Sequence, residues 1–346
     1  MAEPAAAMKE LLARCAAGRP LSEAEAENAF DLIMSGEATP SQIGGFLMAL
    51  RTRGETVDEI TGAARAMRQK ALTIRAPAGA VDTCGTGGDE AGTVNVSTAA
   101  ALVVAACGAP VAKHGNRASS SRSGSADVLK ALGVNTDAEP ETVERGLAEM
   151  DIGFLMAPRH HAAMRHVAGP RKELGTRTIF NLLGPLSNPA GADRQVVGVF
   201  HRDWVEPMAE VLGRLGVGRA WVVHGADGLD ELTVTGPTHV AEVRGDDIVT
   251  FTVEPESVGL GRWTLDDLRG SDAEANAEAL RRVLAGDPGA YRDIVVLNAA
   301  AALVVTDRAT SLDHGVAQAA LAIDEGRAQQ VLDRLVAFTN AAGASA

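Results

Sequence analysis

The stretch from Val81 to Leu132 restricts the possible folds more than any other part of this 346-residue chain. Short apolar segments alternate in it with loops of glycine and polar residues. Ala80 to Thr83 and Pro110 to Lys113 are predicted to be strands, and each is followed by a predicted helix, the first ending at Ala106 and the second running from Ala126 to Leu132. Strands joined by helices at this spacing form a parallel sheet, and ligands bind at the carboxyl ends of such strands.

The same alternation continues along the rest of the chain. Further strands are predicted over 153–155, 195–200 and 219–224, with a hairpin over 238–244 and 248–253, and further helices over 141–150, 204–215, 273–284, 294–305 and 312–338. Residues 158–191 contain four prolines and are predicted to be an irregular connection that crosses between two lobes.

The first 74 residues differ because every predicted element is a helix. Three capping boxes, in which two side chains satisfy each other's free backbone donors, mark helix starts at Ser22 with Glu25, Thr39 with Gln42 and Thr56 with Glu59. The fold class is therefore α/β: a small N-terminal all-helical domain, residues 1–74, plus a large α/β domain, residues 75–346, with a mostly parallel central sheet flanked by helices. Nothing reactive stands out in the helical domain, so a packing or dimerisation role is expected.

Charge and cysteine usage exclude several classes of protein. A net charge of −13 argues against nucleic-acid binding, which requires basic surface to neutralise phosphates. Three cysteines without paired spacing indicate neither a disulfide framework nor a zinc site. The chain starts without the apolar core of a signal peptide, and no apolar run approaches the roughly 20 residues of a membrane span. A cytoplasmic protein is expected.

Three polar segments within 81–132 are suited to binding phosphate. Gly85, Gly87 and Gly88 allow backbone amides to converge on an anion, whereas a carboxylate at Asp89 needs a cation or a ligand hydroxyl nearby. The second segment, Asn95 to Thr98, precedes a helix whose first amides favour negative charge, and Asn95 or Ser97 can cap that helix. The third places Lys113 and Arg117 just after a strand, with a run of serines behind them.

A fourth segment, from Trp221 to Glu231, reads as a strand followed by an acidic turn. Adjacent carboxylates at Asp230 and Glu231 suit a hard divalent cation such as Mg²⁺. Two phosphate-binding loops elsewhere favour this interpretation over that of a solvated turn. The cluster of His160, His161 and His166 lacks the spacing of a zinc site.

In these segments the chain resembles the anthranilate phosphoribosyltransferases, members of the nucleoside phosphorylase-like phosphoribosyltransferases. Six ordered motifs carry the resemblance: GTGGD (85–89), NVST (95–98), KHGNRA (113–118), SGSADVLKALG (123–133), RTIFNLLGPLSNP (177–189) and GLDEL (228–232). The resemblance covers nearly the whole chain. One departure is His160-His161-Ala162-Ala163-Met164, where family members often carry Tyr-His-Pro-Ala-Met.

The resemblance implies transfer of a phosphoribosyl group from 5-phosphoribosyl 1-diphosphate (PRPP) to the amine of anthranilate in tryptophan biosynthesis. It implies Mg²⁺, two ions, bound by Ser97, Asp230 and Glu231, and anthranilate contacts from Gly85, Asn116 and Arg171. It also implies a homodimer formed through the helical domain, completed by part of 165–191. The residues expected to contact PRPP are Gly85, Gly88, Asp89, Thr93, Asn95, Val96, Ser97, Thr98, Lys113, His114, Gly115, Asn116, Arg117, Ala118, Ser119, Ser120, Ser121 and Ser125.

Two other functions compete with this one. A pyrimidine nucleoside phosphorylase of the same architecture would use free phosphate, but KHGNRA and the acidic turn favour diphosphate with magnesium. A non-catalytic relative that binds nucleic acid is opposed by the acidic net charge. No acid–base pair is evident, so catalysis is expected to be electrostatic. Closure of the two lobes around the substrates is a further hypothesis.

Overall fold

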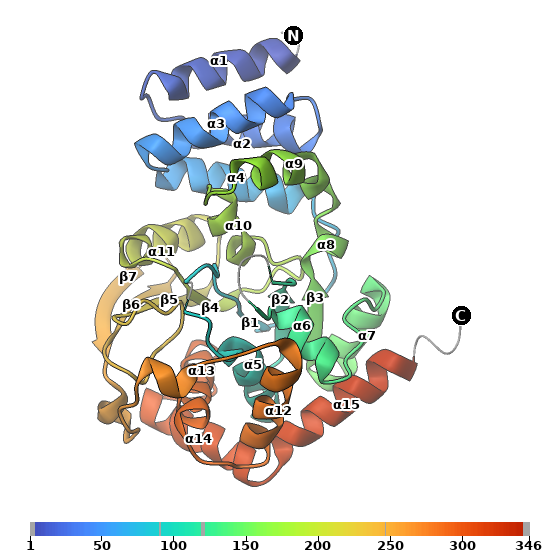
Figure 1. Ribbon diagram of the computed structural model, residues 1–346, viewed down its shortest axis with the longest axis vertical. Coiled ribbons are helices and arrows are strands. Elements are labelled where there is room, and N and C mark those ends of the chain that lie inside the picture. Colours follow the sequence, from blue (N-terminus) through green and yellow to red (C-terminus); the bar gives the residue numbers. More distant parts are fainter. Residues whose placement is uncertain (1–3, 90, 119–121, 246, 342–346) are drawn as a thin grey trace.

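The chain folds into a small helical lobe and a larger α/β lobe, as the sequence predicts (Figure 1). A computed structural model describes residues 4–89, 91–118, 122–245 and 247–341. In Figure 1 the helical lobe stands above the sheet, and the segment from α8 to α10 runs between the two lobes. The predicted division into an all-helical and an α/β part is therefore confirmed.

The helical lobe starts with four helices whose ends are set by local hydrogen bonds. These helices are α1 (Pro4–Ala16), α2 (Glu23–Met34), α3 (Pro40–Arg53) and α4 (Val57–Gln69). All three predicted capping boxes form, at Ser22, Thr39 and Thr56. Gly36 and Gly54 take positive φ where α2 and α3 end, a backbone conformation that costs glycine little.

The α/β lobe is built on one seven-stranded sheet with the strand order β3-β2-β1-β4-β5-β6-β7. Its first five strands are parallel, and β6 and β7 form an antiparallel hairpin at one edge. The strands are β1 (Val81–Thr83), β2 (Val111–Gly115), β3 (Ile152–Met156), β4 (Arg194–Gly198), β5 (Arg219–Gly225), β6 (Thr238–Arg244) and β7 (Asp247–Val253).

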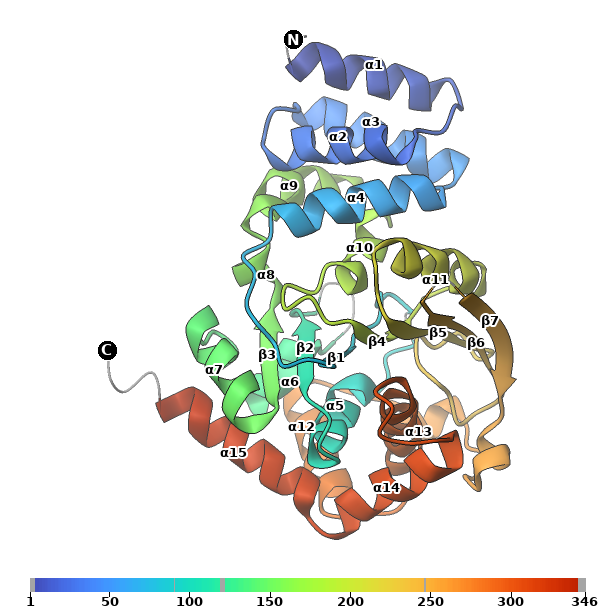
Figure 2. The ribbon, with the colours of Figure 1, turned by 180° about the vertical axis from the view of Figure 1, so that it is seen from behind.

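Side chains that alternate along the strands fill a separate core on each face of the sheet. On β5, Trp221 and Val223 pack into one core, whereas Ala220 and Val222 pack into the other. The first core is covered by helices that Figure 2 shows from behind: α5 (Val96–Ala106), α12 (Ala273–Leu284), α13 (Ala290–Val305), α14 (Leu312–Asp324) and α15 (Arg327–Ala341). The second core includes α11 (Val205–Arg214) and continues into the helical lobe, so the two lobes share buried apolar packing.

The proline-rich connection over 158–191 is helical, which corrects the prediction of an irregular segment. It forms α8 (Ala157–His160), α9 (Arg165–Leu174) and α10 (Phe180–Leu186), with Pro170 inside α9 and Pro185 inside α10. Proline normally disfavours a helix interior because it removes a backbone donor. Here Val167 and Pro170 are buried where α9 packs against α2 and α3, and this burial offsets the cost.

The predicted helix over 312–338 is two helices, α14 and α15, because Gly326 takes a φ of +69° between them. The shorter helices α6 (Ser125–Ala131) and α7 (Pro140–Met150) complete the lobe. Within the described ranges, no helix is long and apolar enough to cross a membrane.

Candidate active site

The chain that follows strands β1, β2, β3 and β5 lines one cleft of about 740 Å³ between the two lobes. This is the position that a parallel sheet predicts for a ligand. The described residues predicted for the site all line it: Gly85, Gly88, Asp89, Thr93, Asn95, Val96, Ser97, Thr98, Lys113, His114, Gly115, Asn116, Arg117, Ala118, Ser125, Arg171, Asp230 and Glu231. The three remaining predicted residues, Ser119, Ser120 and Ser121, lie outside the described residues.

The acidic turn after β5 lies directly against the glycine loop after β1. Asp230 Oδ2 accepts a hydrogen bond from the Gly87 amide at 2.7 Å. A Cβ at residue 85 would stand 2.4 Å from that same carboxylate oxygen, and a Cβ at residue 198 would stand 1.5 Å from the Asp230 carbonyl oxygen. Glycine at these two positions therefore allows the acidic turn to approach the sheet.

Glu231 connects the acidic turn to the second polar segment, Asn95 to Thr98. Its Oε1 accepts a hydrogen bond from the Ser97 amide at 3.1 Å, at the start of α5. Lys113, which is buried, donates to the Thr83 carbonyl at 2.7 Å and lies 3.4 Å from Ser97 Oγ. Three segments that are far apart in the sequence thus meet around Ser97.

Burial raises the pKa of the three carboxyl groups at this junction. Removal from water is the main cause for Asp89, Asp230 and Glu231. Mutual repulsion adds to the shift, since Asp89 raises the pKa of Asp230 and Asp230 raises that of Glu231, while the charge of Lys113 partly opposes the shift at Glu231. Oxygen ligands that repel one another in this way fit a divalent cation such as Mg²⁺.

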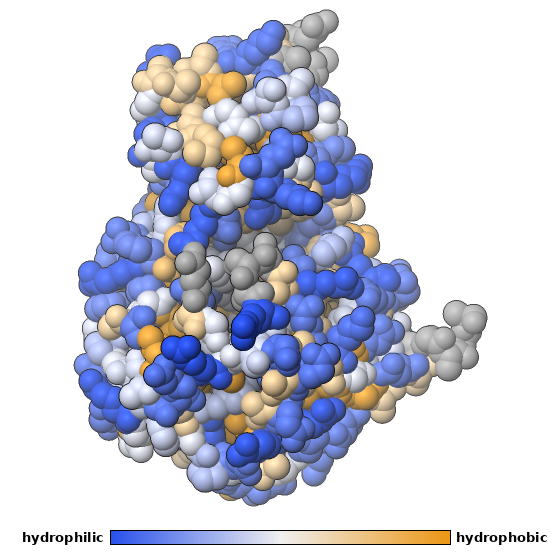
Figure 3. Space-filling view, in the orientation of Figure 1, coloured by the Kyte–Doolittle hydropathy of each residue, from blue (hydrophilic) through white to orange (hydrophobic). Residues whose placement is uncertain are grey.

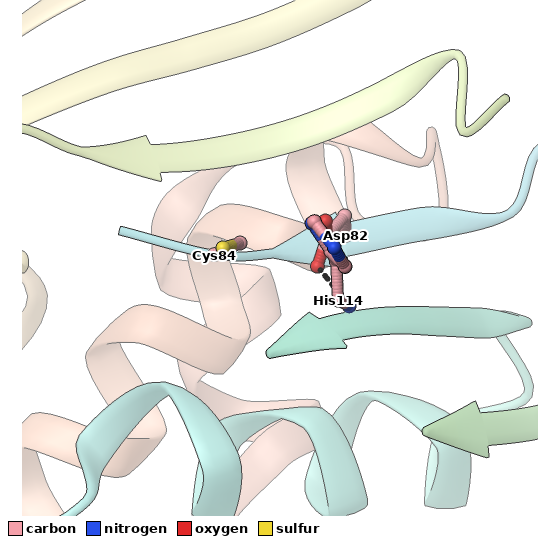
Figure 4. A group of neighbouring side chains, drawn as sticks. All are labelled: Asp82, Cys84 and His114. Carbon is pink, nitrogen blue, oxygen red and sulfur yellow. Dashed lines mark hydrogen bonds between the residues drawn. The ribbon is translucent and has the colours of Figure 1, made fainter. Parts of the chain in front are cut away.

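A second group of possible ligands, Asp82, Cys84 and His114, comes from β1, the residue after it and β2 (Figure 4), and Cys84 and His114 also line the cleft. The Asp82 carboxylate already accepts hydrogen bonds from the His114 amide at 3.1 Å and from Asn188 Nδ2 at 2.7 Å. Burial raises the pKa of the Cys84 thiol and lowers that of His114 to about 3. A protonated thiol and a satisfied carboxylate favour a structural role for this group over metal binding.

The opposite wall of the cleft comes from the crossing segment. Arg171 on α9 stacks over the Phe180 ring, with Cζ 5.4 Å from the ring centroid, and no polar partner is found for its guanidinium among the described residues. His161 lies 5.2 Å from His114 between ring centroids, and burial lowers its pKa to about 4, so both imidazoles are neutral at neutral pH. The wall that faces the loops after β1 and β2 thus offers the cations of Arg165 and Arg171 and the neutral ring of His161, which lies against His114 of β2.

Sequence reasoning missed part of this wall. His161, Arg165, Phe180, Asn181, Gly184 and Pro185 all line the cleft. The motif from Arg177 to Pro189 contains four of these residues and could have indicated them. The directions of their side chains depend on α10, a helix that was not predicted because the segment contains prolines. His160, left out of the predicted site, instead donates from Nδ1 to the Leu72 carbonyl at 2.7 Å and holds the chain that leaves α4.

The prediction that Asn95 or Ser97 caps α5 with its side chain is wrong. Asn95 occupies the N-cap position, but neither side chain closes a capping hydrogen bond. The Asn95 amide group instead contacts neighbouring loops, with Nδ2 donating to the Ser123 carbonyl at 3.2 Å.

Comparison with known proteins agrees with this architecture. Residues 78–329 match the model of the glycosyl transferase family α/β domain, and residues 9–71 match that of the family's helical bundle domain. The anthranilate phosphoribosyltransferase of Paramagnetospirillum magneticum is 66% identical over 335 residues, which cover 97% of each chain. The chain belongs to the anthranilate phosphoribosyltransferase family.

Solved structures of this family share the fold. The anthranilate phosphoribosyltransferase of Thermus thermophilus superposes with a TM-score of 0.91 at 47% identity, covering 95% of this chain and 99% of the other. The Saccharomyces cerevisiae enzyme in complex with PRPP and Mg superposes with a TM-score of 0.88 at 28% identity, covering 97% of this chain and 98% of the other.

Proposed function

We propose that the cleft transfers the phosphoribosyl group of PRPP to the amine of anthranilate, giving N-(5-phosphoribosyl)anthranilate and diphosphate in tryptophan biosynthesis. One observation carries this proposal: three polar loops suited to phosphate and an acidic turn meet at one side of a cleft, and the half-buried Arg171 faces them from the other side. This arrangement provides for a diphosphate, a cation and a carboxylate in one space.

The phosphoribosyl donor is bound by the loops at 85–98 and 113–125. The backbone amides of their described residues and the charges of Lys113 and Arg117 are proposed to surround the phosphates, and Asp89 to contact the ribose hydroxyls or a bound cation; these residues all line the cleft. When the bond to diphosphate breaks, these fixed donors stabilise the negative charge of the departing group without having to reorganise.

Ser97, Asp230 and Glu231 would hold magnesium, with two ions expected. Bound magnesium neutralises part of the charge of the leaving diphosphate. Asp230 and Glu231 accept hydrogen bonds from the Gly87 and Ser97 amides, so ligand binding would exchange these contacts for contacts with the cation.

Arg171 positions the acceptor by holding its planar carboxylate in the fork of the guanidinium, with Gly85 and Asn116 on the donor side. An aromatic amine is unprotonated at neutral pH and needs no strong base. The neutral His114 and His161 are consistent with this, since neither carries a charge that would repel or compete for the acceptor.

Residues 1–74, with part of 165–191, are proposed to form a homodimer interface. Leu12, Ala13 and Met48 lie exposed or half-buried on α1 and α3, and Figure 3 shows apolar residues gathered on one side of the helical lobe. Light scattering coupled to gel filtration tests this, and a monomer at micromolar concentration would contradict it.

A cytoplasmic location stays a prediction, in line with three cysteines that form no disulfide.

The reaction is tested by following the fluorescence of anthranilate after PRPP is added, with and without Mg²⁺. Magnesium-dependent loss of fluorescence is expected. The absence of any loss, or phosphorolysis of thymidine or uridine by the same preparation, would contradict the proposed function.

A further inference from the structure

The loop that carries Asn95 is held from behind by a segment far away in the sequence. The Val94 amide donates to the Leu268 carbonyl at 3.1 Å, and the Gly270 amide donates to the Gly92 carbonyl at 2.8 Å. A Cβ at residue 270 would stand 2.4 Å from the Thr93 carbonyl oxygen, so the close approach requires glycine there. The segment 268–271 therefore forms a support for the donor loop.

Asn276, on the first turns of α12, joins this support to the loop. Its Oδ1 accepts a hydrogen bond from the Ser271 amide at 2.7 Å, and its Nδ2 donates to Asn95 Oδ1 at 3.0 Å. The side chain is almost completely buried, with 2% of its surface exposed. Loss of such a buried amide group leaves its former partners unsatisfied, which costs more than the hydrogen bond itself.

The side chain of Asn95 also contacts a third loop, the one around Ser123. Its Nδ2 donates to the Ser123 carbonyl at 3.2 Å, while its Oδ1 also accepts from Ser123 Oγ at 3.4 Å. Tyr291, on α13, donates to the Asn95 carbonyl at 3.3 Å. Both acceptor positions of the Asn95 side-chain oxygen are thus used inside the protein, and so is one of its two amide hydrogens.

We infer that Asn276 is a positioning residue for the phosphoribosyl donor, acting through Asn95 to hold three cleft-lining segments, around Asn95, Ser123 and Ser271, in register. Asn276 itself does not line the cleft, whereas these three residues do. Because the side chain of Asn95 is engaged by protein partners, this loop binds the donor mainly with its backbone amides, whose direction depends on the support behind them. This inference rests on the proposed function for the identity of the donor.

The loops proposed to bind PRPP and the helix that carries Arg171 lie on different sides of the cleft, so a change at Asn276 should affect the two substrates differently. Arg171 stands on α9, and none of the contacts of Asn276 reaches that helix. A change at Asn276 should therefore raise the KM for PRPP and leave the KM for anthranilate nearly unchanged.

The test compares Asn276→Ala, Asn276→Asp, Asn95→Ala and the double variant Asn276→Ala/Asn95→Ala. Asn276→Asp keeps the acceptor for Ser271 but loses the donor to Asn95, so it tests the inference even if the alanine variant folds poorly. Thr339→Val is the control, because it removes another buried hydrogen bond, from the Asn135 amide at 3.1 Å, on the distant helix α15. Circular dichroism and thermal unfolding monitor the fold of each variant.

Both Asn276 variants are expected to raise the KM for PRPP about tenfold, while the KM for anthranilate changes by less than about twofold. In the Asn95→Ala background, Asn276→Ala should add less than about a further twofold, since its effect passes through Asn95. Equal effects in both backgrounds, a parallel rise in both KM values, no change in either, or the same rise in Thr339→Val would each overturn the inference.

Calorimetric binding of PRPP and Mg²⁺ in the absence of anthranilate separates this inference from the proposed function. Donor binding that weakens in the Asn276 variants supports the positioning role even if the wild-type protein fails to consume anthranilate.

Discussion

Replacement of Gly198 by alanine tests the idea that the acidic turn needs contact with the end of β4. The new Cβ would lie 1.5 Å from the Asp230 carbonyl oxygen and 2.4 Å from its carbonyl carbon, both of them backbone atoms that no rotamer change can move away. The turn must retreat by roughly 2 Å to reach an ordinary contact distance. Asp230 and Glu231 would then be displaced from the Gly87 and Ser97 amides that they contact.

A displacement of about 1 Å in a catalytic group can lower the rate about 100-fold. We therefore expect kcat/KM of Gly198→Ala to fall at least 100-fold, which corresponds to about 2.7 kcal/mol of transition-state stabilisation. Overpacking should also lower the free energy of unfolding by about 1–3 kcal/mol. Because the proposed metal ligands would be displaced, the variant should also require more Mg²⁺ for half-maximal rate.

The assay is the loss of anthranilate fluorescence over a range of Mg²⁺ concentrations, accompanied by urea unfolding. Gly213→Ala is the matched control, since the nearest atom to its Cβ would be Val243 Cγ1 at an ordinary 3.7 Å. Activity of Gly198→Ala within twofold of the wild type, with an unchanged magnesium requirement, would refute the reasoning.

Three further predictions concern the acceptor, the metal and the core. Arg171→Ala should raise the KM for anthranilate about 10- to 100-fold with little change for PRPP, because a charged hydrogen bond is lost, and an unchanged anthranilate KM would contradict the assigned role. Because burial raises the pKa of Asp230 and Glu231, protons compete with the cation, so the Mg²⁺ concentration for half-maximal rate should rise as the pH is lowered from 8.5 to 6. In Glu231→Gln this Mg²⁺ concentration should depend less steeply on pH. An equally steep dependence would contradict the idea that protonation of Glu231 competes with the cation. Asn188→Ala should lower the free energy of unfolding by about 2–4 kcal/mol in urea, because it removes one of the two donors to the buried Asp82 carboxylate and a donor to the Ala112 carbonyl. A loss below about 0.5 kcal/mol would show that this contact contributes little.

The loops that line one side of the cleft could be predicted because they follow strands directly. Three local patterns together indicated a phosphate and metal site, although each alone had a structural alternative: glycine at 85, 87 and 88, the acidic turn at 230–231, and the cations at 113 and 117. Two kinds of residue escaped prediction. Phe180 belongs to a helix that contains a proline, and His161 lies directly after the short helix α8, which also contains one. Asn276 carries no chemical pattern, since a buried asparagine on an amphipathic helix is not distinctive.

The sequence by itself determined what depends on neighbours within one turn of chain. The capping boxes at Ser22, Thr39 and Thr56 each close between residues three apart, so residue type and spacing were enough. The tertiary structure decided the contacts across long separations. Gly87 meets Asp230 across 143 residues, and Asn95 meets Asn276 across 181. Such pairs depend on strand order and on how closely elements approach, which are set by the packing of the whole core. For the same reason Asn95 contacts α12 and the Ser123 loop, although its position in the chain suggested a helix cap.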